Sequence, residues 1–168
     1  PASPLRMQIQ QHAHGITVIN DAYNANPEST AAALRTLVTM AAGRRSWAVL
    51  GEMRELGDGS TQAHFDIGRL VADLGVSHLV AVGQPAQALV SGARSVAGWA
   101  GKADQVEELD AAAEILRRSL LADDIVLVKA SRSLGLDAVV DQVFSGPLHL
   151  DSETGANPIS LDPAEDTA

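Results

Sequence analysis

The run Ile125-Val126-Leu127-Val128 constrains the fold of this 168-residue chain more than any other feature. Four consecutive aliphatic residues offer no polar face to water, and such a strand is typical of a sheet that is covered on both faces. A strand with one face in water would instead alternate apolar and polar residues. The run therefore predicts a central strand of a largely parallel sheet with helices on both sides.

Strand-like and helix-like segments alternate five times along the chain, which is typical of a parallel α/β sheet. The expected strands are 16–19, 46–50, 78–82, a short one within 103–109, and 125–128. The expected helices run from 28 to near 43, from 60 or 61 to about 74, from about 86 to 96, from 111 to 121 and from 134 to 144. Residues 6–12 can add an antiparallel strand. We therefore predict a three-layer, Rossmann-like α/β sandwich of about six strands, mostly parallel, with one antiparallel edge strand.

Capping residues define the predicted helix ends. Asn26 suits the N-cap of the first helix, and Gly43 suits its C-cap. Ser60 or Thr61 is expected to cap the second helix, and Asp110 the fourth.

The charge of the chain divides it into a body and a tail. The formal net charge is −9, and residues 149–168 hold five acidic side chains and no Lys or Arg, which leaves −4 for the rest. We expect residues 1–4 to be a linker stub, 5–147 to form one domain and 148–168 to be an acidic, disordered tail. No cluster of basic residues indicates nucleic-acid binding.

Several kinds of site and location are disfavoured by what the sequence lacks. No apolar run approaches the roughly 18 residues of a membrane span, and the first residues do not resemble a signal peptide. The chain has no Cys, which excludes thiolate metal sites and agrees with a cytoplasmic location. His12, His14 and the pair Asp123-Asp124 are expected to form turns, so we predict no metal site.

A polar loop follows the first buried strand and precedes the first helix. It contains Asp21, Tyr23, Asn24 and Asn26. In open α/β sheets, ligands bind outside the carboxyl ends of the strands. The loop is therefore a candidate binding site, although Asp21, Asn24 and Asn26 are also common turn and cap formers.

Three segments resemble sequence blocks of the Mur ligases. Residues 21–29 (Asp-Ala-Tyr-Asn-Ala-Asn-Pro-Glu-Ser) are similar to the block that opens the C-terminal domain of that family. Residues 50–57, followed by His64, are similar to the second block, and residues 128–133 (Val-Lys-Ala-Ser-Arg-Ser) to the last. The blocks follow the family order over roughly residues 5–144. The chain is thus identified as the C-terminal domain of a Mur ligase.

The resemblance implies an activity and a set of partners. Mur ligases activate a carboxylate as an acyl phosphate with ATP and then form an amide bond. The wording of the first block resembles the members that add D-alanyl-D-alanine to UDP-MurNAc-tripeptide, using ATP and magnesium, in cytoplasmic peptidoglycan precursor synthesis. The expected partners are D-alanyl-D-alanine, ATP and, through other domains, UDP-MurNAc-tripeptide. The protein is expected to be a monomer.

The resemblance also implies which residues face the nucleotide. Asp21 matches the family residue that contacts the ATP ribose. Tyr23, Asn24, Asn26 and Arg6 are expected to face the same ligand. Alternatively, Asp21 forms a turn, Tyr23 is a packed loop anchor and Arg6 is a solvated surface residue.

A second group of residues is implied for the dipeptide. Lys129, Ser131 and Arg132 match the block at the incoming amino-acid site, and a Lys, a hydroxyl and a guanidinium suit a carboxylate. Alternatively, Arg132 pairs with Asp137 and Ser131 caps the last helix. Four residues are expected to form a supporting loop beside this group, namely Glu52, Met53, Glu55 and His64, although a lone His is more often a surface or hydrogen-bonded residue than a catalyst.

The sequence contains no Gly-x-x-x-x-Gly-Lys-Ser/Thr phosphate loop and no Gly-x-Gly-x-x-Gly dinucleotide fingerprint. We therefore expect no catalytic residue in this segment, ATP and magnesium to be bound mainly by another domain, and the chain alone to be inactive in ligation. Three alternatives remain, namely another Mur ligase or a folylpolyglutamate synthetase, a non-catalytic Rossmann-like binding module, and a dinucleotide-dependent enzyme.

Overall fold

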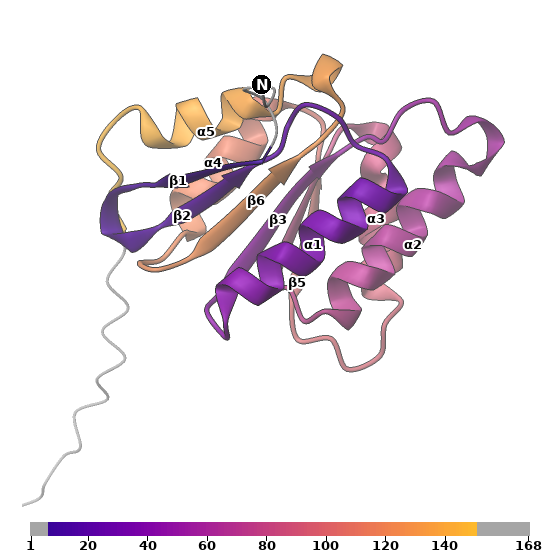
Figure 1. Ribbon diagram of the computed structural model, residues 1–168, viewed down its shortest axis with the longest axis horizontal. Coiled ribbons are helices and arrows are strands. Elements are labelled where there is room, and N and C mark those ends of the chain that lie inside the picture. Colours follow the sequence, from indigo (N-terminus) through magenta and orange to yellow (C-terminus); the bar gives the residue numbers. More distant parts are fainter. Residues whose placement is uncertain (1–6, 151–168) are drawn as a thin grey trace, which may run out of the picture.

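The computed structural model describes residues 7–150 and shows a six-stranded sheet between two layers of helices (Figure 1). The strands are β1 (Gln8–Gln11), β2 (Thr17–Asn20), β3 (Ser46–Gly51), β4 (His78–Val82), β5 (Lys102–Val106) and β6 (Ile125–Lys129). The helices are α1 (Pro27–Ala41), α2 (Ser60–Asp73), α3 (Gln87–Arg94), α4 (Leu109–Ser119) and α5 (Asp137–Phe144). The predicted fold class is confirmed.

The strand β6 lies in the middle of the sheet, whose order is β1-β2-β6-β3-β4-β5. Val126 of β6 is opposite Val18 of β2 on one side and Trp47 of β3 on the other. Every residue of β6 is buried, as the unbroken aliphatic run predicts. The one antiparallel pair joins β1 to β2, with Ile9 opposite Ile19.

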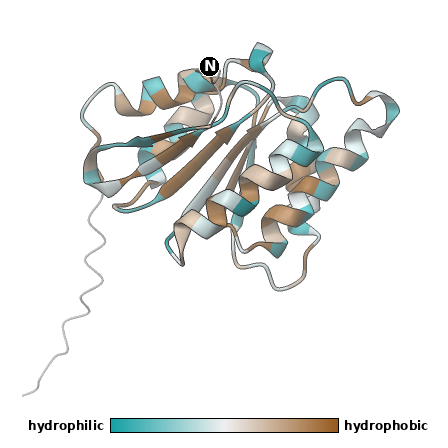
Figure 2. Ribbon diagram, in the orientation of Figure 1, coloured by the Kyte–Doolittle hydropathy of each residue, from teal (hydrophilic) through white to brown (hydrophobic). Residues whose placement is uncertain are grey.

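Two hydrophobic clusters hold the helices on the sheet. Helices α1, α2 and α3 cover one face, where Leu34 and Leu37 pack with Leu50 of β3. Helices α4 and α5 cover the other face, where Leu116 and Val139 belong to the second cluster. Figure 2 shows that the central strands are hydrophobic whereas β1 at the edge is largely hydrophilic. The core therefore lies on both sides of β6 and β3.

Most of the predicted helix boundaries differ slightly from those observed. Asn26 caps α1 as predicted, because its side chain accepts a hydrogen bond from the backbone N–H of Ser29. The prediction for α2 is wrong, because Ser60 is its first residue and Gly59, which has no side chain, occupies the N-cap. Asp110 lies inside the first turn of α4 and not at its N-cap, but a carboxylate there still interacts favourably with the helix dipole.

The predicted end of α1 and the predicted start of α5 also differ from those observed, because residues with positive φ lie close to them. The left-handed residue that ends α1 is Ala42, with φ of 48°, and Gly43 follows it with φ of 88°. Helix α5 begins three residues later than predicted, because Arg132–Leu134 forms a separate 3-10 turn that Gly135 ends with φ of 65°.

The end of the described chain packs against the turn between β1 and β2. Leu148 is buried, and its carbonyl oxygen lies 2.9 Å from Nε2 of His14. The ring of His12 stacks on Phe144 with 4.1 Å between centroids. The predicted domain boundary at 147 stays a prediction, since residues 1–4 and most of 148–168 lie outside the described residues. Within residues 7–150, no helix combines the length and hydropathy that crossing a membrane requires.

Candidate functional site

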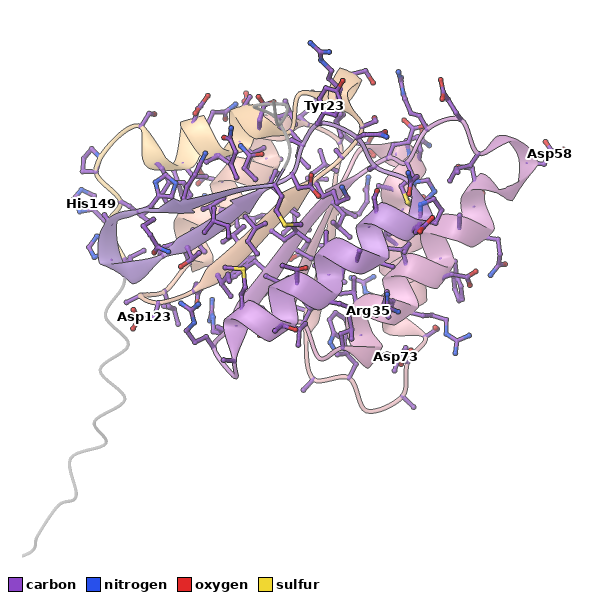
Figure 3. All side chains as sticks on the ribbon, in the orientation of Figure 1. Tyr23, Arg35, Asp58, Asp73, Asp123 and His149 are labelled. Atoms are coloured by element: carbon purple, nitrogen blue, oxygen red, sulfur yellow. The ribbon has the colours of Figure 1, made fainter. Side chains whose placement is uncertain are left out.

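The candidate residues gather at the end of the sheet where β2, β3 and β6 finish. Parallel strands bring their carboxyl ends to one edge, so the loops after these three neighbouring strands lie together. Figure 3 shows Tyr23 at this end of the molecule and Asp123, which precedes β6, at the other. The sequence blocks at 21–29, 50–57 and 128–133 are therefore adjacent in space.

Lys129 joins the loop after β2 to the end of β6. Its Nζ lies 2.7 Å from Oδ2 of Asp21 and 2.8 Å from the backbone carbonyl oxygen of Asn24. The side chain of Lys129 is only 2% exposed, and that of Asp21 is 14% exposed. The structure thus places Lys129, predicted to bind the dipeptide, against two residues predicted to face the nucleotide.

The loop after β3 is held by hydrogen bonds to the segment after β6 and to α2. The backbone N–H of Ser131 donates to the carbonyl oxygen of Glu52 at 3.3 Å. The backbone N–H of Met53 donates to Nε2 of His64 at 2.9 Å. Because Nε2 accepts, the ring hydrogen lies on Nδ1, which donates to the carbonyl oxygen of Ser60 at 2.7 Å. Fully buried His64 therefore orients the loop and is not placed to react with a ligand.

Arg132 and Tyr23 face each other across the loops. The guanidinium carbon of Arg132 lies 5.6 Å from the centroid of the Tyr23 ring, which is a cation–π distance. Arg132 is exposed, whereas Ser131 is buried with its Oγ 3.5 Å from Oγ of Ser133. Arg132 is thus the cation of this block that a ligand can reach.

Two cavities open at this edge, and Tyr23 lines both of them. The first has a volume of about 380 Å³ and a mostly apolar wall. It is lined by Met7, Asp21, Tyr23, Asn24, Ser29, Ala32, Ala33, Thr36 and Lys129. The second has a volume of about 430 Å³ and a more polar wall. It is lined by Gln8, Gln10, Asn20, Ala22, Tyr23, Arg132, Asp137 and Asp141. We call these the Asp21 cavity and the Arg132 cavity.

The side chains of the remaining candidate residues make other contacts. Asn26 and Ser29 form a reciprocal capping box, so the amide oxygen of Asn26 serves the helix. Glu55 is exposed with φ of 62°, and Glu52 lies 3.8 Å from Arg54. Arg6 lies outside the described residues. Among residues 7–150, no three His, Cys, Asp or Glu side chains are grouped so as to hold a metal ion.

Sequence reasoning named Asp137 as an alternative partner of Arg132 but missed the acidic wall of the Arg132 cavity. Asp137 and Asp141 both line it, and their spacing of four places them on one face of α5. That spacing is visible in the sequence, but the approach of α5 to Tyr23 is not. The two backbone carbonyl groups that hold the loops, at Asn24 and Glu52, leave no signal in residue identity.

The sequence matches a protein family. The family model described as Mur ligase, glutamate ligase domain matches residues 5–132. A UDP-N-acetylmuramoyl-tripeptide–D-alanyl-D-alanine ligase of Mycobacterium tuberculosis (strain ATCC 25618 / H37Rv) is 46% identical over 162 residues, covering 86% of this chain and 32% of that protein. The ligase of the same name from Mycobacterium leprae (strain TN) is 44% identical over 155 residues, covering 84% and 30%. The chain therefore spans about a third of the length of these relatives.

Solved structures have the same fold. A crystal structure of MurF from Acinetobacter baumannii superposes with a TM-score of 0.74 at 29% identity, covering 87% of this chain and 32% of that one. A MurF ligase structure from Thermotoga maritima, solved with ADP, gives a TM-score of 0.66 at 22% identity, covering 84% and 31%, and shows the shared fold. The resemblance that the three sequence blocks predict is confirmed. This chain belongs to the Mur ligase family, of which it contains the glutamate ligase domain.

Proposed function

We propose that this chain is the part of a ligase that contacts dipeptide and nucleotide, and that the whole enzyme joins D-alanyl-D-alanine to UDP-MurNAc-tripeptide with ATP. The names of the relatives from Mycobacterium tuberculosis and Mycobacterium leprae support the reaction. Its product is a cytoplasmic precursor of peptidoglycan. We further propose that the protein works as a monomer.

The observation that carries this proposal is the position of Tyr23 between two cavities of different chemistry. The Asp21 cavity has a carboxylate at its polar end, whereas the Arg132 cavity has an exposed guanidinium. A ligase must hold a nucleotide and an incoming amine close to each other, because proximity and orientation supply much of its rate. Two adjacent cavities that share one aromatic side chain meet that need.

The Asp21 cavity fits the nucleoside end of ATP. Oδ2 of Asp21 accepts from Lys129, and within residues 7–150 the other oxygen, Oδ1, makes no hydrogen bond. That oxygen can accept a ribose hydroxyl. Met7, Ala32 and Ala33 provide an apolar wall of the kind that suits a base.

The Arg132 cavity fits a short zwitterionic peptide. The guanidinium of Arg132 suits its carboxylate, because the two planar groups can form paired hydrogen bonds. Asp137 and Asp141 line the same cavity and suit an ammonium group. Ser131 directly precedes Arg132 and is the N-cap of the 3-10 turn in which Arg132 lies.

The chemistry itself falls to the substrates and to other parts of the enzyme. ATP supplies the phosphoryl group that turns the tripeptide carboxylate into an acyl phosphate. The dipeptide amine attacks the acyl carbon, the amide bond forms and phosphate leaves. The residues of this chain bind and orient, and magnesium is held by residues other than those described. We therefore propose that this chain alone does not catalyse ligation.

A chimeric enzyme tests the proposed function. In the ligase of Mycobacterium tuberculosis, this chain replaces the segment that it matches. We expect ATP-dependent ligation of D-alanyl-D-alanine and no turnover of L-alanyl-L-alanine. A folded chimera, by circular dichroism, that binds ATP and ligates neither dipeptide would show that the proposal is wrong.

A titration followed by NMR then assigns the two cavities. D-Alanyl-D-alanine is expected to shift the amide signals of Arg132 and Asp137, and ATP those of Asp21 and Asn24. Tyr23 is expected to respond to both ligands. If the dipeptide shifts the Asp21 loop and leaves Arg132 unchanged, the assignment of the cavities is wrong.

A further inference from the structure

We propose that Lys129 is a positioning residue, whose ammonium group fixes the loop at Asp21 and Asn24 for the nucleotide and does not bind the dipeptide. This inference rests on the proposed function and changes the role that the sequence block implies for Lys129. It starts from the contacts of Nζ, which lies 2.7 Å from Asp21 Oδ2 and 2.8 Å from the carbonyl oxygen of Asn24.

Burial makes the ammonium group of Lys129 inaccessible to a dipeptide. The side chain is 2% exposed, and two of its three N–H donors are engaged. A ligand carboxylate that displaced Asp21 from Nζ would leave Asp21, whose side chain is only 14% exposed, without its cation. Lys129 also lines the Asp21 cavity and not the Arg132 cavity.

The two contacts of Lys129 fix the direction of the loop. The first, on a side chain, holds Asp21, and the second, on the backbone, holds Asn24 three residues later. The backbone N–H of Asp21 also donates to the carbonyl oxygen of Val128 at 2.9 Å. The loop is therefore attached to the end of β6 at Asp21 and again at Asn24, and the two contacts of Asp21 restrict the orientation of its Oδ1.

Charge gives Lys129 a second effect on the same ligand. Asp21 carries a negative charge close to where the polyanionic nucleotide is proposed to bind. A cation in direct contact with that carboxylate cancels most of its repulsion at the phosphates, because the pair is nearly neutral at a distance. Removing the cation should therefore weaken nucleotide binding through both geometry and charge.

Steady-state kinetics of the chimera separate the two roles. With Lys129→Met, we expect the KM for ATP to rise about tenfold, as for the loss of a hydrogen bond to a charged group, while the KM for the dipeptide stays unchanged. The variant Arg132→Gln is the matched control and should raise the KM for the dipeptide. If Lys129→Met raises the KM for the dipeptide and leaves that for ATP unchanged, Lys129 binds the dipeptide and the inference is wrong.

A double-mutant cycle adds a readout that a general loss of structure would not give. If Lys129 acts through Asp21, the variant Asp21→Asn combined with Lys129→Met should be no worse for ATP than the worse single variant. Additive effects would contradict the inference. Should Lys129→Met fail to fold, Lys129→Arg keeps a cation beside Asp21, and a rise in the KM for the dipeptide without a rise in that for ATP would again contradict the inference.

NMR of this chain separates failure of the inference from failure of the proposed function. In Lys129→Met, the amide signals of Asp21 and Asn24 should shift or broaden, while that of Met53, which His64 holds, should stay unchanged. This readout needs no ligase activity. Unchanged signals at Asp21 and Asn24 would overturn the positioning role even in an active enzyme.

Discussion

At the scale of single residues, a carboxylate joins distant segments of the chain at each end of the sheet. Asp21 does so at the carboxyl end, through Lys129. Asp124, which is 1% exposed, does so at the amino end. It accepts hydrogen bonds from Nε1 of Trp47 at 2.8 Å and from the backbone N–H of Leu121 at 2.9 Å, and its Oδ2 lies 3.1 Å from the guanidinium of Arg45. The sequence-based interpretation of Asp123-Asp124 as a turn missed this function of Asp124.

Removal of the Asp124 carboxylate should destabilise the fold. The variant Asp124→Ala leaves the indole N–H of Trp47 and the backbone N–H of Leu121 without their acceptor, while Arg45 keeps the carbonyl oxygen of Ser119. A buried donor that is left unpaired costs about 1–3 kcal/mol. Urea denaturation measures the change. The matched control is Asp123→Asn at the exposed neighbour, which keeps its left-handed φ of 67°. Equal losses in the two variants would contradict this explanation.

His78 should make the stability depend on pH. Its ring stacks on Trp47, and burial, followed by the charges of Arg45 and Lys102, lowers its pKa from the ordinary value of 6.5, although Asp124 and Asp104 oppose this. The unfolded chain therefore takes up a proton at higher pH than the folded chain. As a result, the free energy of unfolding falls as the pH drops through 6.5 and below.

Thermal denaturation at a series of pH values measures this dependence. In His78→Phe, which keeps an aromatic ring on Trp47, the loss of stability between about pH 7.5 and 5.5 should be smaller than in the wild type. Burial also lowers the pKa of His12, so part of the dependence should remain. Exposed His149 provides the control, and a flatter profile in His149→Gln than in His78→Phe would count against this role.

At the scale of elements, α2 and α3 touch through two glycines. A Cβ on Gly68 would overlap the backbone carbonyl of Leu89, and one on Gly92 would overlap that of Phe65. Because neither residue has a side chain, the backbones of α2 and α3 can come into direct contact. Neither glycine ends a helix, so helix propensity alone would favour Ala at both positions.

The variant Gly68→Ala should therefore destabilise the chain, although Ala favours helix by about 1 kcal/mol over Gly. The overlap with the carbonyl of Leu89 forces the helices apart and opens the packing beneath them. Gly59→Ala is the matched control, because a Cβ at that exposed position meets nothing. Chemical denaturation compares them, and stabilisation by both variants would refute the close-contact explanation.

Local patterns predicted the elements well and their contacts less well. Aliphatic runs and Ala/Leu-rich segments identified the strands and helices, since burial on both faces gives an unbroken apolar run and burial on one face gives a helical period. The pairing of Lys129 with Asp21 spans 108 positions in the chain, and no local pattern encodes it. The neighbours of the parallel strands were likewise open, because parallel pairing is fixed by the packing of the whole sheet.

At the scale of the whole molecule, β6 joins two parts that otherwise share no strand pairing. Strand β2 pairs with β1 and β6, and β3 pairs with β6 and β4. Within the described residues, β2 and β3 do not pair with each other. The sheet is therefore continuous only when β6 is in place.

Truncation tests this dependence. A chain that ends at residue 122 lacks β6 and α5, so we expect no cooperative thermal unfolding and poor dispersion of its NMR signals. A chain that ends at residue 150 keeps every described element and should unfold cooperatively. Cooperative unfolding of the shorter chain would show that β3, β4 and β5 form a stable unit without β6.

The central position of β6 also determines when the sheet can form during translation. Translation delivers β2 and β3 early, but the strand that joins them is the last to be made. Until then Val18 and Ile19 of β2 lack their pairing with β6, and Asp21 lacks Lys129. Assembly of the proposed nucleotide loop therefore has to wait for the synthesis of β6. A translation product that stops before β6 should therefore lack this part of the proposed nucleotide site.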